Sequence, residues 1–227
     1  MWKWLLAALA LAVIGLVLLP LRQVAHYVAP ELTATEVSGS VWRGRLKDAH
    51  WRGVELGDLK IGVDPRALLG GQLRLDFDRG AAGLTGRLGT GGGIHLAERL
   101  NGAVRVPLAS PYATNLDVAL TDAAISVDSA GVCRAASGEI ATRLSGIPGI
   151  GTSPILQGVA RCDDGALLLP LVSADGSIGL DVHLWADRRY RADIKIASTS
   201  MVVRLALTAA GFTTDPNGSS RRFEGRL

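Results

Sequence analysis

The chain has few of the residues and motifs that carry catalysis or metal binding. Its four histidines, His26, His50, His95 and His183, are far apart, and none stands in an H-E-x-x-H or similar ligand spacing. No G-x-S-x-G segment offers a serine nucleophile. The glycine-rich GTGGG at 89–93 lacks the Lys-Ser/Thr of a phosphate-binding loop and is typical of a hairpin turn. Unless polar residues converge only in three dimensions, the sequence predicts no catalytic residue, no metal site and no cofactor.

Charge of one sign is not concentrated anywhere in the sequence. Lysine and arginine total 24 against 21 aspartates and glutamates, which gives a formal net charge of +3. The arginines are dispersed along the chain and form no long block of the kind that binds phosphate backbones. Nucleic acid is therefore not an expected partner.

Long hydrophobic runs are also absent, except at the N-terminus. The segment WLLAALALAVIGLVLLPL, Trp4–Leu21, carries no charged residue and is long enough to cross a hydrocarbon core of roughly 30 Å as a helix. A signal-peptide core is the rival interpretation, but no A-x-A cleavage site follows. We therefore expect an uncleaved anchor at 1–21 with a cytoplasmic N-terminus, and one β-rich domain at 22–227 beyond the membrane.

Cysteine is scarce, with only Cys133 and Cys162. An even count in a domain beyond the membrane predicts one disulfide in an oxidising compartment. The alternative, a metal pair completed by His183, lacks the Cys-x-x-Cys spacing or the histidine pair of a closed zinc site.

What the sequence does have is alternation of apolar and polar residues with the period of a β-strand. In RYRADIKI, 189–196, Tyr190, Ala192, Ile194 and Ile196 alternate with charged residues, and similar runs occur at 59–63, 73–77, 116–120 and 178–184. Turn residues separate these runs at short intervals. This pattern is typical of antiparallel strands with one solvated face.

Two segments break this alternation. ALLLPLV, 166–172, is apolar throughout, which indicates burial on both faces, while Pro170 indicates an edge or a bulge. Ser200 to Ala210, followed by Gly211, reads as a capped helix, with a strand as the alternative. The predicted fold is mainly β: a transmembrane helix, then a curved antiparallel β-sheet or β-sandwich domain with a short C-terminal helix.

The tripeptide Trp-Arg-Gly occurs twice, with Trp42 and Gly44 in the first copy and Trp51 and Gly53 in the second. On one unbroken strand the spacing of nine would aim the tryptophans at opposite faces. KDAH, 47–50, reads as a turn or bulge, so we expect both indoles to face inward from neighbouring strands. Aromatic core is the favoured interpretation, and a binding surface for a partner or sugar is the alternative.

The stretch SGSVWRGRL, 38–46, resembles the N component of the type II secretion system, the GspN family. The similarity continues through alternating strands that end in Leu-Leu-Gly-Gly at 68–71. A cysteine pair then flanks the Gly-Ile-Pro-Gly turn at 146–149. It covers nearly the whole chain and depends on the order and spacing of these features.

This resemblance implies a single-pass inner-membrane protein with a periplasmic β domain and no enzymatic residue. Its expected partners are the inner-membrane bilayer and other secretion subunits that export folded proteins across the outer membrane. The shorter stretch GVELGDLKIGVDPRALLGG, 53–71, is also similar to AsmA-type envelope proteins, which are associated with lipid handling. The second hypothesis is therefore a β groove for a lipid ligand, since few large aromatics are present to fill it.

Overall fold

The computed structural model describes residues 20–22, 31–51, 54–80, 83–107, 115–143, 153–198, 200–216 and 218–226. The chain forms two compact units, unit 1 at Met1–Gly89 and unit 2 at Thr90–Leu227. Both are built mainly from antiparallel strands, as the alternation predicts.

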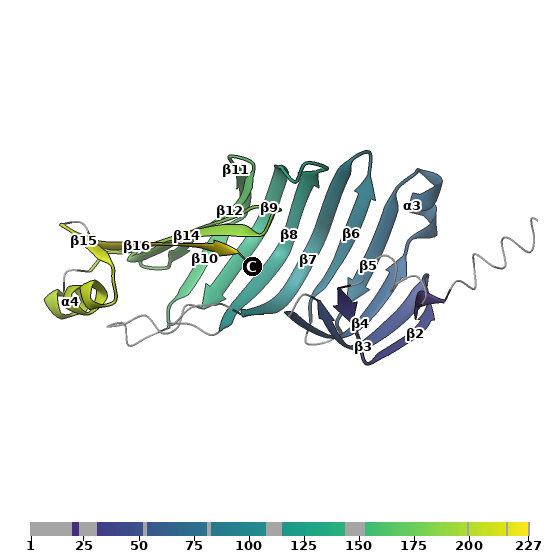
Figure 1. The fold of residues 1–227 in the computed structure, drawn as a ribbon, viewed down its shortest axis with the longest axis horizontal. Coiled ribbons are helices and arrows are strands. Elements are labelled where there is room, and N and C mark those ends of the chain that lie inside the picture. Colours follow the sequence, from purple (N-terminus) through teal and green to yellow (C-terminus); the bar gives the residue numbers. More distant parts are fainter. Residues whose placement is uncertain are drawn as a thin grey trace, which may run out of the picture. The chain divides into compact units, whose positions relative to one another are not determined.

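Unit 1 is an antiparallel sheet whose strands follow the order of the chain closely (Figure 1). Hydrogen-bonded neighbours run β1, β3, β4, β5 and β6, and β2 pairs with β3. The strands are β1 (Leu32–Thr33), β2 (Glu36–Ser40), β3 (Arg43–Trp51), β4 (Val54–Val63), β5 (Leu73–Asp78) and β6 (Thr85–Gly91).

A short helix, α3 (Pro65–Leu69), follows β4 where a turn was expected. Asp64 is its N-cap, and the Oδ1 atom of Asp64 accepts a 2.9 Å hydrogen bond from the Arg66 N–H. Pro65 suits the first helical position because its missing N–H would have had no partner there. The helix ends where the Gly70 N–H donates to the Ala67 carbonyl. The Asp64-Pro65 pair therefore starts a helix here and does not form a simple turn.

The core of unit 1 is small and includes Leu21. Leu46, Ala49 and Leu59 are buried with it, each 7% exposed or less. Leu21 belongs to the predicted anchor, whose residues 1–19 lie outside the described residues. Within the part of the chain that the structure describes, no helix has the length and apolarity needed to cross a membrane.

Unit 2 is a larger antiparallel sheet with one helix. Its neighbouring strands run β7, β8, β9, β10, β12, β13, β14, β16 and β15, and β11 pairs with β12. The elements are β7 (Ile94–Pro107), β8 (Asn115–Asp128), β9 (Cys133–Arg143), β10 (Ile155–Val159), β11 (Arg161–Asp163), β12 (Ala166–Ser173), β13 (Ile178–Leu184), β14 (Arg189–Ile196), α4 (Met201–Ala209), β15 (Thr213–Asp215) and β16 (Gly218–Arg226).

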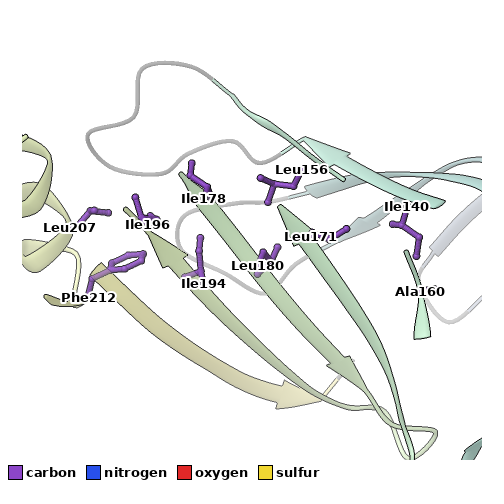
Figure 2. Close-up of a cluster of buried hydrophobic side chains, with 10 residues drawn as sticks. All are labelled: Ile140, Leu156, Ala160, Leu171, Ile178, Leu180, Ile194, Ile196, Leu207 and Phe212. Carbon is purple, nitrogen blue, oxygen red and sulfur yellow. The ribbon is translucent and has the colours of Figure 1, made fainter. Parts of the chain in front are cut away.

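The side chains on one face of the second half of this sheet form the core of unit 2. Ile178 lies opposite Ile196, and Leu180 lies opposite Ile194, all four at most 8% exposed. Figure 2 shows these side chains gathered with Leu156, Leu171 and Ile140 from neighbouring strands, and with Leu207 and Phe212 at one end. The alternation predicted for 178–184 and 189–196 is confirmed.

Bulges bend the first strands of unit 2. Arg99 in β7, Asp122 in β8 and Gly138 in β9 have φ angles of 52°, 46° and 100°, and the strand register shifts near each of them. The Asn101 side chain accepts a 2.8 Å hydrogen bond from the Asp122 N–H and fixes this kink. Because bulges increase local bend and twist, the sheet curves, and in Figure 1 β7 to β9 face the viewer while β16 is edge-on. The described strands of unit 2 form one curved sheet, which corrects the β-sandwich alternative.

Strand β12 is internal, so the edge position inferred from Pro170 is wrong. One side of β12 pairs with β13 through residues 167–172. The other side pairs with β11 at 166–168 and with β10 at 172–173. Pro170 stands at the break between these two partners, where the ladder requires no N–H. Gly158 approaches the Pro170 carbonyl there so closely that a Cβ atom would overlap it.

The predicted disulfide is present between Cys133 and Cys162, whose Cα atoms are 5.6 Å apart. It joins the first residue of β9 to the middle of β11. Both sulfur atoms are held in the disulfide and are therefore not available as thiolate ligands. The alternative of a metal pair with His183 is wrong.

The turn before β13 is built around the Asp175 carboxylate. Its Oδ1 atom accepts from the Ser173 hydroxyl at 2.6 Å and from the Ser177 N–H at 3.1 Å, and Oδ2 accepts from the Ser177 hydroxyl at 2.8 Å. These donors, the Ser173 hydroxyl first, lower the pKa of Asp175 from 3.8 to about 2. The buried Ser173 hydroxyl also accepts from the Ile178 N–H, which links the turn to the core.

Removal of the disulfide tests its contribution to stability. Cys133→Ser should destabilise the β domain by about 3 to 4 kcal/mol, because the 29-residue separation is no longer closed in the unfolded chain. Thermal unfolding followed by circular dichroism would show a lower melting temperature, and thiol labelling would find Cys162 free. Two free thiols in wild-type protein taken under non-reducing conditions would contradict the assignment.

Acid should weaken the Asp175 turn within a defined pH range. A carboxylate whose pKa is lowered on folding stabilises the protein above about pH 4, and this contribution is lost as the pH falls toward 2. The melting temperature of Asp175→Asn should therefore lie below that of the wild type at pH 6, and the difference should shrink between pH 4 and pH 2. A difference that stayed constant down to pH 2 would show that ionised Asp175 does not hold the turn.

Candidate functional site

The candidate functional site is the outward face of α4 in unit 2. The helix begins at Ser200, whose hydroxyl accepts from the Val203 N–H, and ends before Gly211, which has a φ of 82°. This confirms the helix predicted for 200–210. The nine helical residues contain no acidic side chain and a single basic one, Arg204.

The inward face of α4 is committed to the core. Leu207 is fully buried (Figure 2). Val203 packs against the same cluster. Arg221 of β16 donates to the Ala210 carbonyl at the helix C-terminus. These contacts hold the helix in place on the sheet.

The outward face is apolar as well. Met201, Val202 and Leu205 are 81%, 79% and 72% exposed. They lie at positions i, i+1 and i+4, so they form one patch on the helix surface. A grouped apolar patch that is exposed to water marks an interaction site. We refer to these three residues as the α4 patch.

A small cleft lies beside the disulfide. Its volume is about 150 Å³, and Ile125, Cys133, Leu167, Leu184 and Trp185 contribute to its walls. Sites for small molecules usually enclose roughly 300–1,000 Å³. This cleft is therefore smaller than the lipid groove expected under the second hypothesis.

A charged, aromatic cluster lies near this cleft. His183 stacks on Trp185 with ring centroids 5.9 Å apart, and its Nε2 atom is 3.3 Å from Asp163 Oδ2. The guanidinium groups of Arg189 and Arg191 lie 5.4 and 5.8 Å from the Trp185 ring. Among the described residues, no group of three or more histidine, cysteine, aspartate or glutamate side chains is placed to hold a metal ion.

The landmarks of the repeated tripeptide lie in unit 1. Trp42 is half-buried in the turn between β2 and β3, and Trp51 is the last residue of β3. Trp42 therefore comes directly before β3 and Trp51 ends β3, so the two tryptophans do not lie on neighbouring strands as predicted. Gly44 is buried, and a Cβ atom there would overlap the Leu21 side chain. Gly53 lies outside the described residues.

The segment KDAH between the tripeptides forms the predicted bulge and no turn. Asp48 has a φ of 46°, and the pairing of β3 with β4 shifts register on both sides of Ala49. The structure brings none of the tripeptide residues to the α4 patch. Sequence reasoning found the α4 helix but not its patch, although the absence of a polar face in MVVRLAL was a visible signal.

Similarity to known proteins decides the family. A family model described as "Type II secretion system (T2SS), protein N" matches residues 30–221, which is most of the chain. The chain belongs to this family. A curated relative, the type II secretion system protein N of Vibrio cholerae serotype O1 (strain ATCC 39315 / El Tor Inaba N16961), is 35% identical over 89 residues. That alignment spans 39% of this chain and 31% of the relative. No solved structure matches the chain.

Two leucines of α4 offer a matched test of which helix face contributes to the stability of the fold. Leu207→Ala should cost about 2–5 kcal/mol of unfolding free energy, because it empties a fully buried site. Leu205→Ala, which removes the same atoms from a largely exposed site, should change it by no more than about 0.5 kcal/mol. Chemical denaturation of both variants checks this, and equal losses would place Leu205 in the core as well.

Proposed function

We propose that this chain is a non-enzymatic accessory subunit of the type II secretion system. In this proposal residues 1–21 anchor it in the bacterial inner membrane, and the β domain stands in the periplasm. The α4 patch binds another subunit and so aids the export of folded proteins across the outer membrane.

The family match carries this proposal. It extends over both units, from residue 30 to residue 221, and the only function in the family description is type II secretion. The curated relative supports the same assignment, although it aligns with less than half of this chain.

Two further features support the proposed anchor in the membrane and the proposed periplasmic location of the β domain. The Cys133–Cys162 disulfide is the kind of bond that persists in the periplasm and is rare in the cytoplasm. The uncharged run at Trp4–Leu21 has the composition and length of a membrane anchor. An anchored chain with its bulk in the periplasm satisfies both.

The α4 patch supports a role in assembly. Its three side chains make no contribution to core packing, because the opposite face of the helix contacts the core. A partner with an apolar groove would remove them from water, in the manner of helix-in-groove recognition. The helix is already formed and held, so its binding would cost little ordering entropy.

Photocrosslinking in living cells tests the contact directly. A photoreactive residue at position 205 should form an adduct with another secretion subunit, whereas one at Leu69 of α3, which is 92% exposed, should form much less. An adduct with lipid alone would place the α4 patch on the membrane and overturn the subunit contact.

Export should depend on the patch. Met201→Ser combined with Leu205→Ser should reduce secretion of an exoprotein, because two exposed apolar contacts are lost without loss of core packing. The control Leu69→Ser should secrete normally. Secretion and steady-state protein level would be measured together in a strain lacking the chromosomal copy. Normal export from the double variant would reject the role of the patch, and normal export from the deletion strain would reject the accessory function.

A further inference from the structure

The short helix α3 in unit 1 and the turn after it carry leucines that take no part in the core. None of the five helical residues is buried. Leu69 is 92% exposed, and Leu68 and Leu73 are each 41% exposed. The chain turns back between them, where the Gly71 N–H donates to the Leu68 carbonyl at 3.0 Å. The three leucines therefore lie around one tight turn of the chain, and we refer to them as the α3 tip.

The α3 tip lies at the end of the sheet where the proposed anchor meets unit 1. Pro20, near the end of the apolar run at 4–21, forms a β-bridge with Ser40, the last residue of β2. The Val63 N–H, at the end of β4, donates to the carbonyl of Val41, the residue after Ser40, at 3.1 Å. The helix α3 begins two residues after Val63. Because neighbouring strands are roughly 5 Å apart, Pro20 and the start of α3 lie within about 20 Å of each other.

No free linker separates the proposed anchor from unit 1. Leu21, the last residue of the apolar run, is 5% exposed and belongs to the core cluster with Leu46 and Leu59. An anchor that ends at Leu21 therefore continues directly into the folded sheet. When this anchor crosses the bilayer as proposed above, the end of the sheet that carries Pro20 and the α3 tip lies at the membrane surface.

Basic side chains accompany the α3 tip at this end of the sheet. Arg22, Arg43 and Arg66 are all exposed. Arg43 lies opposite Ser40 in the pairing of β2 with β3, and Arg66 is part of α3. No ion pair joins any of these three arginines to another described residue. Asp64, the acidic residue nearest to α3 in the sequence, caps this helix by accepting from the Arg66 N–H. This end of the sheet therefore presents positive charge beside exposed leucines.

We propose that the α3 tip inserts into the headgroup region of the membrane, with Arg22, Arg43 and Arg66 against the phosphates of anionic phospholipids. The exposed leucines leave water when they enter the bilayer, which is favourable in proportion to their apolar area. Guanidinium groups bind phosphate oxygens through charge-assisted hydrogen bonds. Trp42, half-buried in the turn at the same end, suits this position because tryptophan is enriched at membrane interfaces.

The membrane fits this surface better than a protein partner because of where the surface lies. The tip is close to the point where the chain leaves the proposed anchor, and the charges beside it match phosphate groups. The inference rests on the proposed anchor and does not depend on the α4 patch, which belongs to unit 2. The anchor still holds the chain in the membrane when the tip contact is lost, so Leu69→Ser remains a valid control for the α4 patch.

Fluorescence quenching in lipid nanodiscs tests the contact with the full chain. Both native cysteines are in the disulfide, so a single added cysteine can carry an environment-sensitive dye. Gln72→Cys places the dye at an exposed position beside the α3 tip, and Glu55→Cys places it at an exposed position near the other end of β4. Lipids with a nitroxide near the headgroup should quench the dye at 72 and leave the dye at 55 unchanged. An inserted apolar surface reaches roughly 5–10 Å into the boundary between headgroups and acyl chains, so the emission at 72 should also shift to the blue.

Two sets of variants separate the leucines from the arginines. Leu68→Ser combined with Leu69→Ser should abolish quenching at position 72, because the apolar surface is lost. Arg43→Gln combined with Arg66→Gln should weaken the contact about fivefold per charge in discs that contain anionic phospholipid. The matched control removes two exposed charges elsewhere, through Lys60→Gln and Lys195→Gln, and should leave the quenching unchanged.

The outcomes distinguish this contact from the anchor on which it rests. A chain that stays in the disc without quenching at 72, or with equal quenching at 72 and 55, would overturn the contact and leave the anchor intact. A chain that alkaline carbonate washes out of membranes would overturn the anchor and the contact together. Equal losses in the arginine variant and in its lysine control would overturn the role of the arginines.

Photocrosslinking in cells gives a second readout. A photoreactive residue at Leu69 should attach to phospholipid, because the α3 tip lies among the headgroups. An adduct with protein alone would assign the tip to a protein partner and overturn the membrane contact.

Discussion

Removal of one sheet face from water is the constraint on which unit 2 depends. Strands β13 and β14 present apolar residues at alternate positions to one side, among them Ile178, Leu180, Ile194 and Ile196. A side chain of this kind contributes about 1.5–3 kcal/mol when it is fully buried. Leu207 and Phe212 cover one end of this face. The helix that carries Leu207 is therefore fixed on the sheet, and its other face is left to the solvent.

The two faces of the same strands serve different purposes. On the dry face, packing determines which residues are tolerated. On the wet face, the pairs Arg191–Glu224 and Arg222–Asp193 are exposed, and exposed ion pairs typically contribute only about 0–1 kcal/mol each. Their contribution to stability is therefore small.

The sequence predicted the regular parts of the fold best. Alternation in RYRADIKI gave the faces of β14 correctly, and Ser200 with Gly211 marked α4. Local sequence signals failed where the pairing of strands determines the structure. Pro170 suits an edge, but a change of partner strand accommodates it inside the sheet. The KDAH segment forms a bulge within β3 and does not turn the chain, so Trp51 ends the strand that begins directly after Trp42. The pattern of a single sequence does not distinguish a bulge from a turn.

The candidate site could be predicted only in part for a similar reason. Arg204 is the one charged residue in MVVRLAL, so the sequence alone does not say which of the apolar sides packs on the core. Leu207 rather than Leu205 is buried because the chain leaves β14 and returns in β15 on a path that only the folded sheet defines. The charges of β16 were visible in the sequence, but their opposition to Arg191 and Asp193 depends on a register that links distant segments.

The disulfide has a consequence for the integrity of the chain when a protease cuts it. Cys133 and Cys162 bracket the stretch between the start of β9 and β11. A single backbone cut anywhere between them divides the polypeptide but leaves the two fragments covalently joined. Such a nicked molecule would migrate as an intact chain until it is reduced, and both strands of the β9–β10 pair would stay tethered to the same sheet.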